Sequence, residues 1–187
     1  MNKFVEKMLE YNRVFVEHEL YKKYTATKYP DKKIAVLACM DTRMTELLPA
    51  ALGLKNGDVK LIKNAGGQVM HPYGSAVFSL LVAVYELDVD TILVVGHDDC
   101  GGRLLDGKDL MAKMKAKGIT GDVIEHIEAN HKNLEQWLTG FGDVEDSVKN
   151  TMQMIRNHPL IHQGVEVLGF IMNPETGEVR GVHPLEE

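Results

Sequence analysis

The sequence has few of the features that mark membrane, secreted or disulfide-rich proteins. No apolar run approaches the roughly 18 residues of a transmembrane helix, and the opening residues MNKFVEKMLEYNRVF lack the apolar segment of a signal peptide. Its two cysteines are too few for a disulfide framework. We therefore expect a cytoplasmic protein without membrane association. In such a reducing compartment, both cysteines would be free for metal binding or catalysis.

Positive charge is also scarce: 21 lysines and arginines stand against 27 aspartates and glutamates, for a formal net charge of −6. Nucleic-acid-binding surfaces need clustered Lys and Arg, so we expect a small-molecule substrate and no nucleic-acid partner. The 187 residues are 44% hydrophobic and 26% charged, and they contain no repeat or linker. This composition predicts one globular domain, which we divide into an N-terminal helical arm (1–29) and an α/β core (30–187).

The N-terminal residues predict an amphipathic helix. Phe4, Met8, Tyr11 and Phe15 recur at spacings of three and four, with charged residues between them. This spacing is the period of one helix face. We expect the helix to span residues 2–24.

The rest of the chain alternates short β-branched segments with helical ones. Buried strands are predicted for KKIAVLAC, DVKLIKNAGG and DTILVVGH, and helical patterns for residues 49–54, 75–87, 103–138 and 146–157. This alternation predicts an α/β fold with a mostly parallel β-sheet core flanked by helices. The segment GVEVLGFIMNPETGEVRGV predicts a C-terminal strand, turn and strand, because Asn173, Pro174 and Gly177 favour a turn.

Both cysteines lie where a predicted strand ends, Cys39 after AVLA and Cys100 shortly after VVGH. In an open parallel sheet, ligands bind beyond the carboxyl ends of the strands, so neighbouring strands would bring Cys39 and His97 together. We expect Gly101 and Gly102 to let the chain fold back so that Cys100 joins them. Two thiolates and one imidazole suit zinc and leave a fourth position for water or substrate. A lone buried cysteine is usually a small hydrophobe, but three ligands at two strand ends favour a metal site.

Asp41 and Arg43 follow the first cysteine in the motif CMDTR. A guanidinium can hold a carboxylate bidentately, keep it ionised and aim it. One carboxylate edge would then be free to accept a hydrogen bond from a metal-bound water. On its own, such a pair would be an ordinary loop salt bridge.

These motifs resemble those of the β-class carbonic anhydrases, whose pattern is C-x-D-x-R followed later by H-x-x-C. The two motifs occupy residues 39–43 and 97–100. The resemblance covers residues 34–102, including IKNAGG, SLLVAVYEL and ILVVGHDDCGG. The C-terminal segment is similar to the compact, archaeal-type branch of the family.

The resemblance implies a zinc enzyme that reversibly hydrates carbon dioxide to bicarbonate and a proton. Zinc would be held by Cys39, His97 and Cys100, with Asp41 and Arg43 as the catalytic dyad. The metal would acidify a bound water, and the resulting hydroxide would attack the substrate. In closed forms known in this family, Asp41 would itself become a fourth metal ligand.

The resemblance also implies a homodimer or larger homo-oligomer, because the family's N-terminal helix packs on a partner. The alternative is that this helix covers its own sheet. Three residues depart from the usual family pattern: Asp98, which adds negative charge beside the site, Phe78, which stands in the apolar helix where many relatives carry an arginine, and Lys63, which stands where an arginine is more frequent.

Features of the sequence also suggest three other functions. Hydrolysis of carbon disulfide or carbonyl sulfide would use the same zinc chemistry on a similar linear substrate. A nucleotide-binding loop at residues 102–109 almost matches G-x-x-x-x-G-K-[ST], but it ends in Asp109, which would repel phosphate. A thiol redox protein would use Cys39 and Cys100 and leave His97 unexplained.

Overall fold

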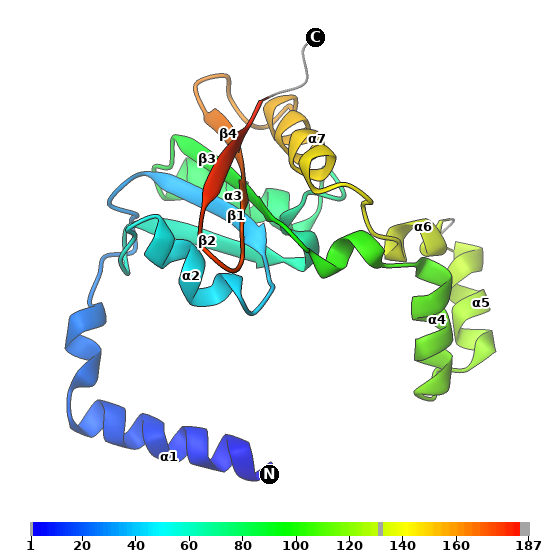
Figure 1. The fold of residues 1–187 in the computed structure, drawn as a ribbon, viewed down its shortest axis with the longest axis horizontal. Coiled ribbons are helices and arrows are strands. Elements are labelled where there is room, and N and C mark those ends of the chain that lie inside the picture. The colour runs from blue at the N-terminus through cyan, green and yellow to red at the C-terminus, as the bar shows by residue number, and fades with distance from the viewer. Residues whose placement is uncertain (1, 131–132, 184–187) are drawn as a thin grey trace.

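The computed structural model describes residues 2–130 and 133–183 and has the α/β architecture predicted from the sequence (Figure 1). Its β-strands are β1 (Ile34–Cys39), β2 (Val59–Asn64), β3 (Thr91–His97), β4 (Glu166–Met172) and β5 (Val179–Val182). Its α-helices are α1 (Lys3–Glu17), α2 (Met44–Ala51), α3 (Ser75–Glu86), α4 (Gly107–Ala116), α5 (Gly121–Asn130), α6 (Leu134–Leu138) and α7 (Val144–Arg156). Short 3₁₀ turns are η1 (Leu20–Tyr24), η2 (Ala65–Gly67) and η3 (Gly101–Leu104).

The five strands form one mainly parallel sheet in the order β2-β1-β3-β4-β5. β1 pairs in parallel with both β2 and β3, and β3 pairs in parallel with β4. Only β5, the second strand of the C-terminal hairpin, runs antiparallel to its neighbour. The carboxyl ends of β1 and β3 therefore lie side by side at one edge of the sheet.

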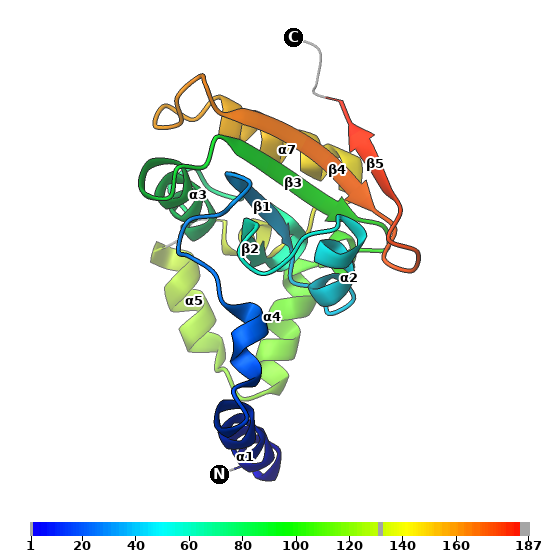
Figure 2. The same ribbon diagram turned by 90° about the vertical axis from the view of Figure 1, so that its left-hand side faces the viewer.

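Helices cover both faces of the sheet (Figure 2). Alternate residues of β1 divide between two apolar clusters, because successive side chains of a strand point to opposite faces. Ala35, Leu37 and Cys39 pack with residues of α3 and α7. Val36 and Ala38 pack on the other face with residues of α2. Because both faces of the sheet are covered, the strand sequences are nearly continuous apolar runs and do not alternate between apolar and polar residues.

Helix α1 of the N-terminal arm stands away from the sheet (Figures 1 and 2). α1 contains no buried residue, so the helix does not cover its own sheet. Among the described residues, no helix combines the length and apolar character needed to cross a bilayer.

Several helix boundaries differ from those predicted. The single helix expected over residues 2–24 ends at Glu17, because Glu19 takes a left-handed conformation with φ 54° and turns the chain into η1. This turn brings the Phe15 and Tyr24 rings to a centroid separation of 6.1 Å.

The other differences are smaller. α2 begins before the predicted residue 49 and contains Pro49 in its interior. The helical region predicted over residues 103–138 forms three helices, α4 to α6, with Gly118 and Gly121 at the first break. α7 begins at Val144 because the Asp143 carboxylate caps its first turn.

Candidate metal centre

Three buried side chains converge at the carboxyl ends of β1 and β3. Cys39 is the last residue of β1 and His97 the last residue of β3, and Ala38 pairs with Val95 across the parallel ladder. Cys100 follows in the next turn. The relative exposures of Cys39, His97 and Cys100 are 5%, 0% and 4%. The structure thus brings together the three residues that the sequence predicted as metal ligands.

The turn that returns Cys100 to this point differs from the predicted one. Asp99, rather than Gly101 or Gly102, adopts the left-handed conformation, with φ 51°. Aspartate tolerates that region better than most side chains. Gly102 is needed for space instead, because a Cβ there would lie 2.7 Å from Cε1 of Phe141.

The separations within the group fit a small tetrahedral ion. The ligand atoms of Cys39, His97 and Cys100 all lie within 4.8 Å of one another, and the two Sγ atoms are 3.8 Å apart. Thiolates bind zinc at about 2.3 Å, so two of them on one tetrahedral ion are separated by about 3.8 Å. The donor set of two sulfurs and one imidazole is one that zinc prefers.

His97 is oriented as a ligand. Its Nδ1 lies 2.8 Å from the Asp98 carbonyl oxygen, which fixes Nδ1 as the hydrogen-bond donor. Its Nε2 is buried and has no hydrogen-bond partner among the described residues. A buried polar atom without a partner is costly, and a metal ion bound by His97 would satisfy it.

The two thiols influence each other's ionisation. The hydrogen bond from Cys100 lowers the pKa of Cys39 to about 4. The same hydrogen bond, together with burial, raises the pKa of Cys100 above its ordinary value. Zinc binding to both sulfurs requires two thiolates, so the raised pKa of Cys100 implies that a proton would be released on binding.

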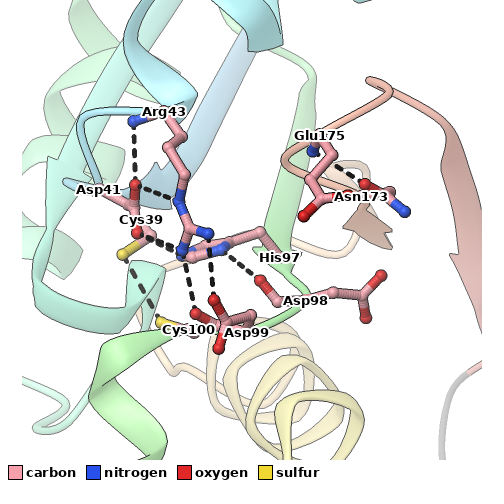
Figure 3. A network of polar contacts seen from close by, with 9 residues as sticks. All are labelled: Cys39, Asp41, Arg43, His97, Asp98, Asp99, Cys100, Asn173 and Glu175. Atoms are coloured by element: carbon pink, nitrogen blue, oxygen red, sulfur yellow. Dashed lines mark hydrogen bonds and ion pairs between the residues drawn. The ribbon is translucent and has the colours of Figure 1, made fainter.

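Arg43 holds the Asp41 carboxylate in a fixed orientation beside the ligand group (Figure 3). Oδ1 of Asp41 accepts hydrogen bonds from Nε and from the backbone N–H of Arg43, and Oδ2 accepts one from Nη2 at 2.9 Å. These bonds lower the pKa of Asp41 to about 2. Oδ2 also lies 3.8 Å from Nε2 of His97. The carboxylate is thus ionised at neutral pH and faces the ligand group.

Arg43 also joins the two ligand-bearing loops. Its Nη1 donates to Oδ2 of Asp99 at 3.1 Å, and its Nη2 donates to the Asp99 carbonyl oxygen at 3.0 Å. Asp99 belongs to the turn between His97 and Cys100. A single guanidinium therefore connects the loop after β1 with the turn after β3.

The negative charge of Asp98 does not face the metal group, contrary to the expectation from the sequence. Its carboxylate is paired with Arg180 of β5 through contacts of 2.8 and 2.7 Å. In Figure 3 this carboxylate points away from the two sulfur atoms. The pairing lowers the pKa of Asp98, and it could not be foreseen because the partners are far apart in the sequence.

Lys63 is a member of the site that sequence reasoning noted only as a departure from the family pattern. It lies on β2 opposite Ala38, which is the residue of β1 that precedes Cys39. Its ammonium is buried without a hydrogen-bond partner among the described residues. Burial lowers its pKa, while the nearby Cys39 and Asp41 oppose this shift. The KNAGG segment thus places a cation close to two groups that carry negative charge.

Comparison with known proteins identifies the family. A family model described as carbonic anhydrase matches residues 34–179. The chain is 48% identical over 172 residues to "Putative carbonic anhydrase YtiB" of Bacillus subtilis, covering 92% of both chains. It is 27% identical over 161 residues to a carbon disulfide hydrolase of Acidithiobacillus thiooxidans, covering 82% of this chain and 78% of that one.

A solved structure extends the likeness over nearly the whole fold. The β-carbonic anhydrase isoform I of Trichomonas vaginalis superposes with a TM-score of 0.87 at 32% identity, covering 96% of this chain and 97% of that one. The family model covers most of the chain, and this structural likeness extends over nearly all of it. The chain therefore belongs to the β-carbonic anhydrase family.

Proposed function

We propose that this protein is a zinc-dependent carbonic anhydrase that interconverts carbon dioxide and bicarbonate plus a proton. The observation that carries the proposal is the juxtaposition of a buried Cys39-His97-Cys100 group with an ionised carboxylate, Asp41, that Arg43 aims toward it. The family match supports the reaction class.

Cys39, His97 and Cys100 would hold the zinc. When bound there, zinc supplies a Lewis acid that lowers the pKa of a coordinated water and makes it a nucleophile near neutral pH. The role of the protein is to fix three donors and leave the fourth position free. The Asp98 carbonyl contributes by setting the tautomer of His97.

Asp41 and Arg43 would form the catalytic dyad. The pKa of Asp41, about 2, keeps its carboxylate ionised throughout the physiological range. Oδ2, on the side of His97, can accept a hydrogen bond from the attacking water and orient it toward the carbon. By binding both oxygens of this carboxylate, Arg43 would keep Asp41 from becoming a fourth metal ligand as in a closed form.

Carbon disulfide and carbonyl sulfide are the alternative substrates. Both are linear electrophiles like carbon dioxide, and the 27% identical relative is a carbon disulfide hydrolase. We favour carbon dioxide because the 48% identical relative carries the name "Putative carbonic anhydrase YtiB".

Functions of other classes fit the site less well. A redox role for Cys39 and Cys100 gives no part to the unpartnered Nε2 of His97. In the loop that resembles a nucleotide-binding motif, the Asp106 carboxylate accepts a hydrogen bond from the Asp109 N–H at the start of α4. A negative side chain thus occupies the position that a phosphate would need.

We further propose that the protein is a homodimer or a multiple of one, and that α1 within the arm of residues 1–29 contributes to the interface. The accessible surface of the chain is 12481 Å², whereas a compact monomer of this mass exposes about 9,000 Å². The excess of about 3,500 Å² is several times the roughly 800 Å² that one partner buries in a standard interface.

The apolar side chains of the arm agree with this account. Phe4, Met8 and Tyr11 of α1 are 70%, 57% and 65% exposed. Large contiguous apolar surfaces of this kind mark interaction sites. A cytoplasmic location is also proposed, because the centre requires two free thiols and a reducing compartment preserves them.

Stopped-flow measurement of carbon dioxide hydration by the zinc-loaded protein tests the proposed reaction. We expect hydration well above the uncatalysed rate, its loss when zinc is removed by a chelator, and its return when zinc is restored. Sulfide release from carbon disulfide should be measured in parallel on the same sample. Zinc-loaded protein that releases sulfide but does not hydrate carbon dioxide would instead establish the alternative substrate.

A further inference from the structure

Arg180 and Asp98 form an ion pair at the margin of the metal centre. Nη1 and Nη2 of Arg180 each donate to a different carboxylate oxygen of Asp98, at 2.8 and 2.7 Å. Such two-pronged contacts define the position of a carboxylate more strictly than one hydrogen bond does. The two side chains are 54% and 40% exposed, and exposed ion pairs contribute little to folding stability. The Arg180–Asp98 ion pair is therefore more important for where it holds Asp98 than for its contribution to folding stability.

The backbone of Asp98 contacts the metal ligand. The Asp98 N–H donates to the Met172 carbonyl at 2.9 Å, and its own carbonyl oxygen lies 2.8 Å from Nδ1 of His97. Arg180 thus binds the side chain of Asp98, and the backbone carbonyl of Asp98 orients the imidazole of His97.

The sheet connects these contacts through neighbouring strands. His97 on β3 is in register with Met172 on β4, and Ile171 on β4 is in register with Arg180 on β5. The hairpin of β4 and β5 therefore holds Asp98 at two points, through its backbone N–H and through its carboxylate. Together these two anchors hold the backbone nitrogen and the side chain of Asp98, and so fix its Cα and the position of its carbonyl carbon.

We propose that Arg180 is a positioning residue for the metal ligand His97. By holding Asp98, Arg180 keeps the carbonyl of that residue on Nδ1 and so presents Nε2 to the metal. The inference rests on the proposed function in that it takes zinc as the ion bound by His97. Arg180 itself contacts neither the metal group nor the Asp41 carboxylate among the contacts of the described residues.

A different explanation assigns Arg180 an electrostatic role only. On that account Arg180 neutralises Asp98, and removing the arginine would free a negative charge without moving the imidazole. The two accounts differ in the effect of Asp98→Ala, which removes the charge and the anchor but retains the backbone carbonyl. Positioning predicts that this variant is impaired, whereas neutralisation predicts that it is not.

The test measures zinc affinity by chelator competition in four full-length proteins: wild type, Arg180→Ala, Asp98→Ala and the double variant. We expect each variant to bind zinc about 10-fold more weakly than wild type, the lower end of the effect of removing a group that orients a metal ligand. The double variant should be no worse than either single one, because all three lose the same contact. Absorption bands of the Co²⁺-substituted variants should shift, because the imidazole is less tightly oriented.

Lys113→Ala is the control. It removes an ion pair with Asp109 of 2.6 Å within α4 and should leave zinc affinity and the Co²⁺ spectrum unchanged. Unaltered zinc affinity in Arg180→Ala, or wild-type affinity in Asp98→Ala or in the double variant, would overturn the positioning role alone. A wild-type protein that binds no zinc would overturn the proposed function and this inference together.

Discussion

The candidate metal-ligand group and the N-terminal helix are both incomplete in the isolated chain, but in opposite ways. Cys39, His97 and Cys100 are buried, and what they lack is a partner for one polar atom, Nε2 of His97. α1 has no buried residue, and what it lacks is cover for an apolar stripe. A buried polar atom without a hydrogen-bond partner can bind an ion, whereas an exposed apolar surface can be covered by another protein surface.

The difference shows which parts of the molecule depend on which partner. The centre is assembled from strands of the same chain, so its geometry is present before any second copy binds. Helix α1 stands apart from the sheet (Figure 1), so its final environment depends on association. Metal binding and dimerisation should therefore be separable by mutation.

Loss of the metal ligands should have the largest effect. Cys39→Ser, His97→Ala and Cys100→Ser should each lose most bound zinc and reduce carbon dioxide hydration by a factor on the order of 10³ or more, because one of three protein ligands is removed. Elemental analysis should find one zinc per chain in the wild type. Ser147→Ala, which alters a buried polar residue of α7, is the matched control. Full zinc retention in all three variants would refute the assigned ligands.

Disrupting the dyad should separate chemistry from metal binding. Arg43→Ala should keep its zinc yet lose about 10²–10³-fold in hydration rate, because Asp41 is no longer aimed and can approach the metal. Asp41→Asn should keep zinc with the fourth position open, and it should also be slow. Lys149→Ala, which breaks an ion pair with Glu145 within α7, serves as control. An Arg43→Ala enzyme as active as wild type would show that the dyad has no catalytic part.

Polar substitutions on the arm should break association while sparing the centre. Phe4→Ser combined with Met8→Ser should raise the dimer dissociation constant about 100-fold, because each change removes a large apolar contact. Glu6→Ser with Glu10→Ser alters the opposite face of α1 and should leave the constant unchanged. Analytical ultracentrifugation measures both, and the zinc content should stay at one per chain. A wild-type protein that is monomeric and fully active at micromolar concentration would contradict the role given to α1.

The smallest effect is the response of the wild type to pH. Two thiolates cancel the formal charge of Zn²⁺, so water bound there should be acidified less than at a site of three neutral imidazoles. Hydration should rise about tenfold from pH 7 into the alkaline range. The contributions of Asp98 and Asp99 are smaller than their sequence position suggests, because each carboxylate faces an arginine. Maximal activity already at pH 6 would contradict this charge argument.

Zinc affinity should change with pH in the same direction. The pKa of Cys100 is raised in the metal-free pair, so its proton must leave when both sulfurs bind zinc. Affinity therefore falls as pH is lowered and rises as pH is increased. Proton release on zinc addition to weakly buffered protein measures this coupling directly.

Much of the fold and the grouping of the three candidate ligands could be predicted because their signals are local. Short β-branched runs alternating with helical segments indicate a parallel sheet, and the carboxyl ends of its strands are where ligands gather. Cys39 and His97 end two such runs, and Cys100 follows within three residues. The pairing of Asp41 with Arg43 was accessible for the same reason, since the two residues are neighbours in one loop.

The sequence by itself determined the element types, the three candidate ligands and the apolar stripe of α1, because periodicity and short spacings encode them. Only the tertiary structure decided that Asp99 makes the turn, that the Lys63 ammonium lies buried near Cys39 and Asp41, and that Asp98 faces Arg180. Those outcomes depend on strand order and register, which join residues far apart in the chain. A charge next to a metal ligand in sequence can therefore point away from it in space.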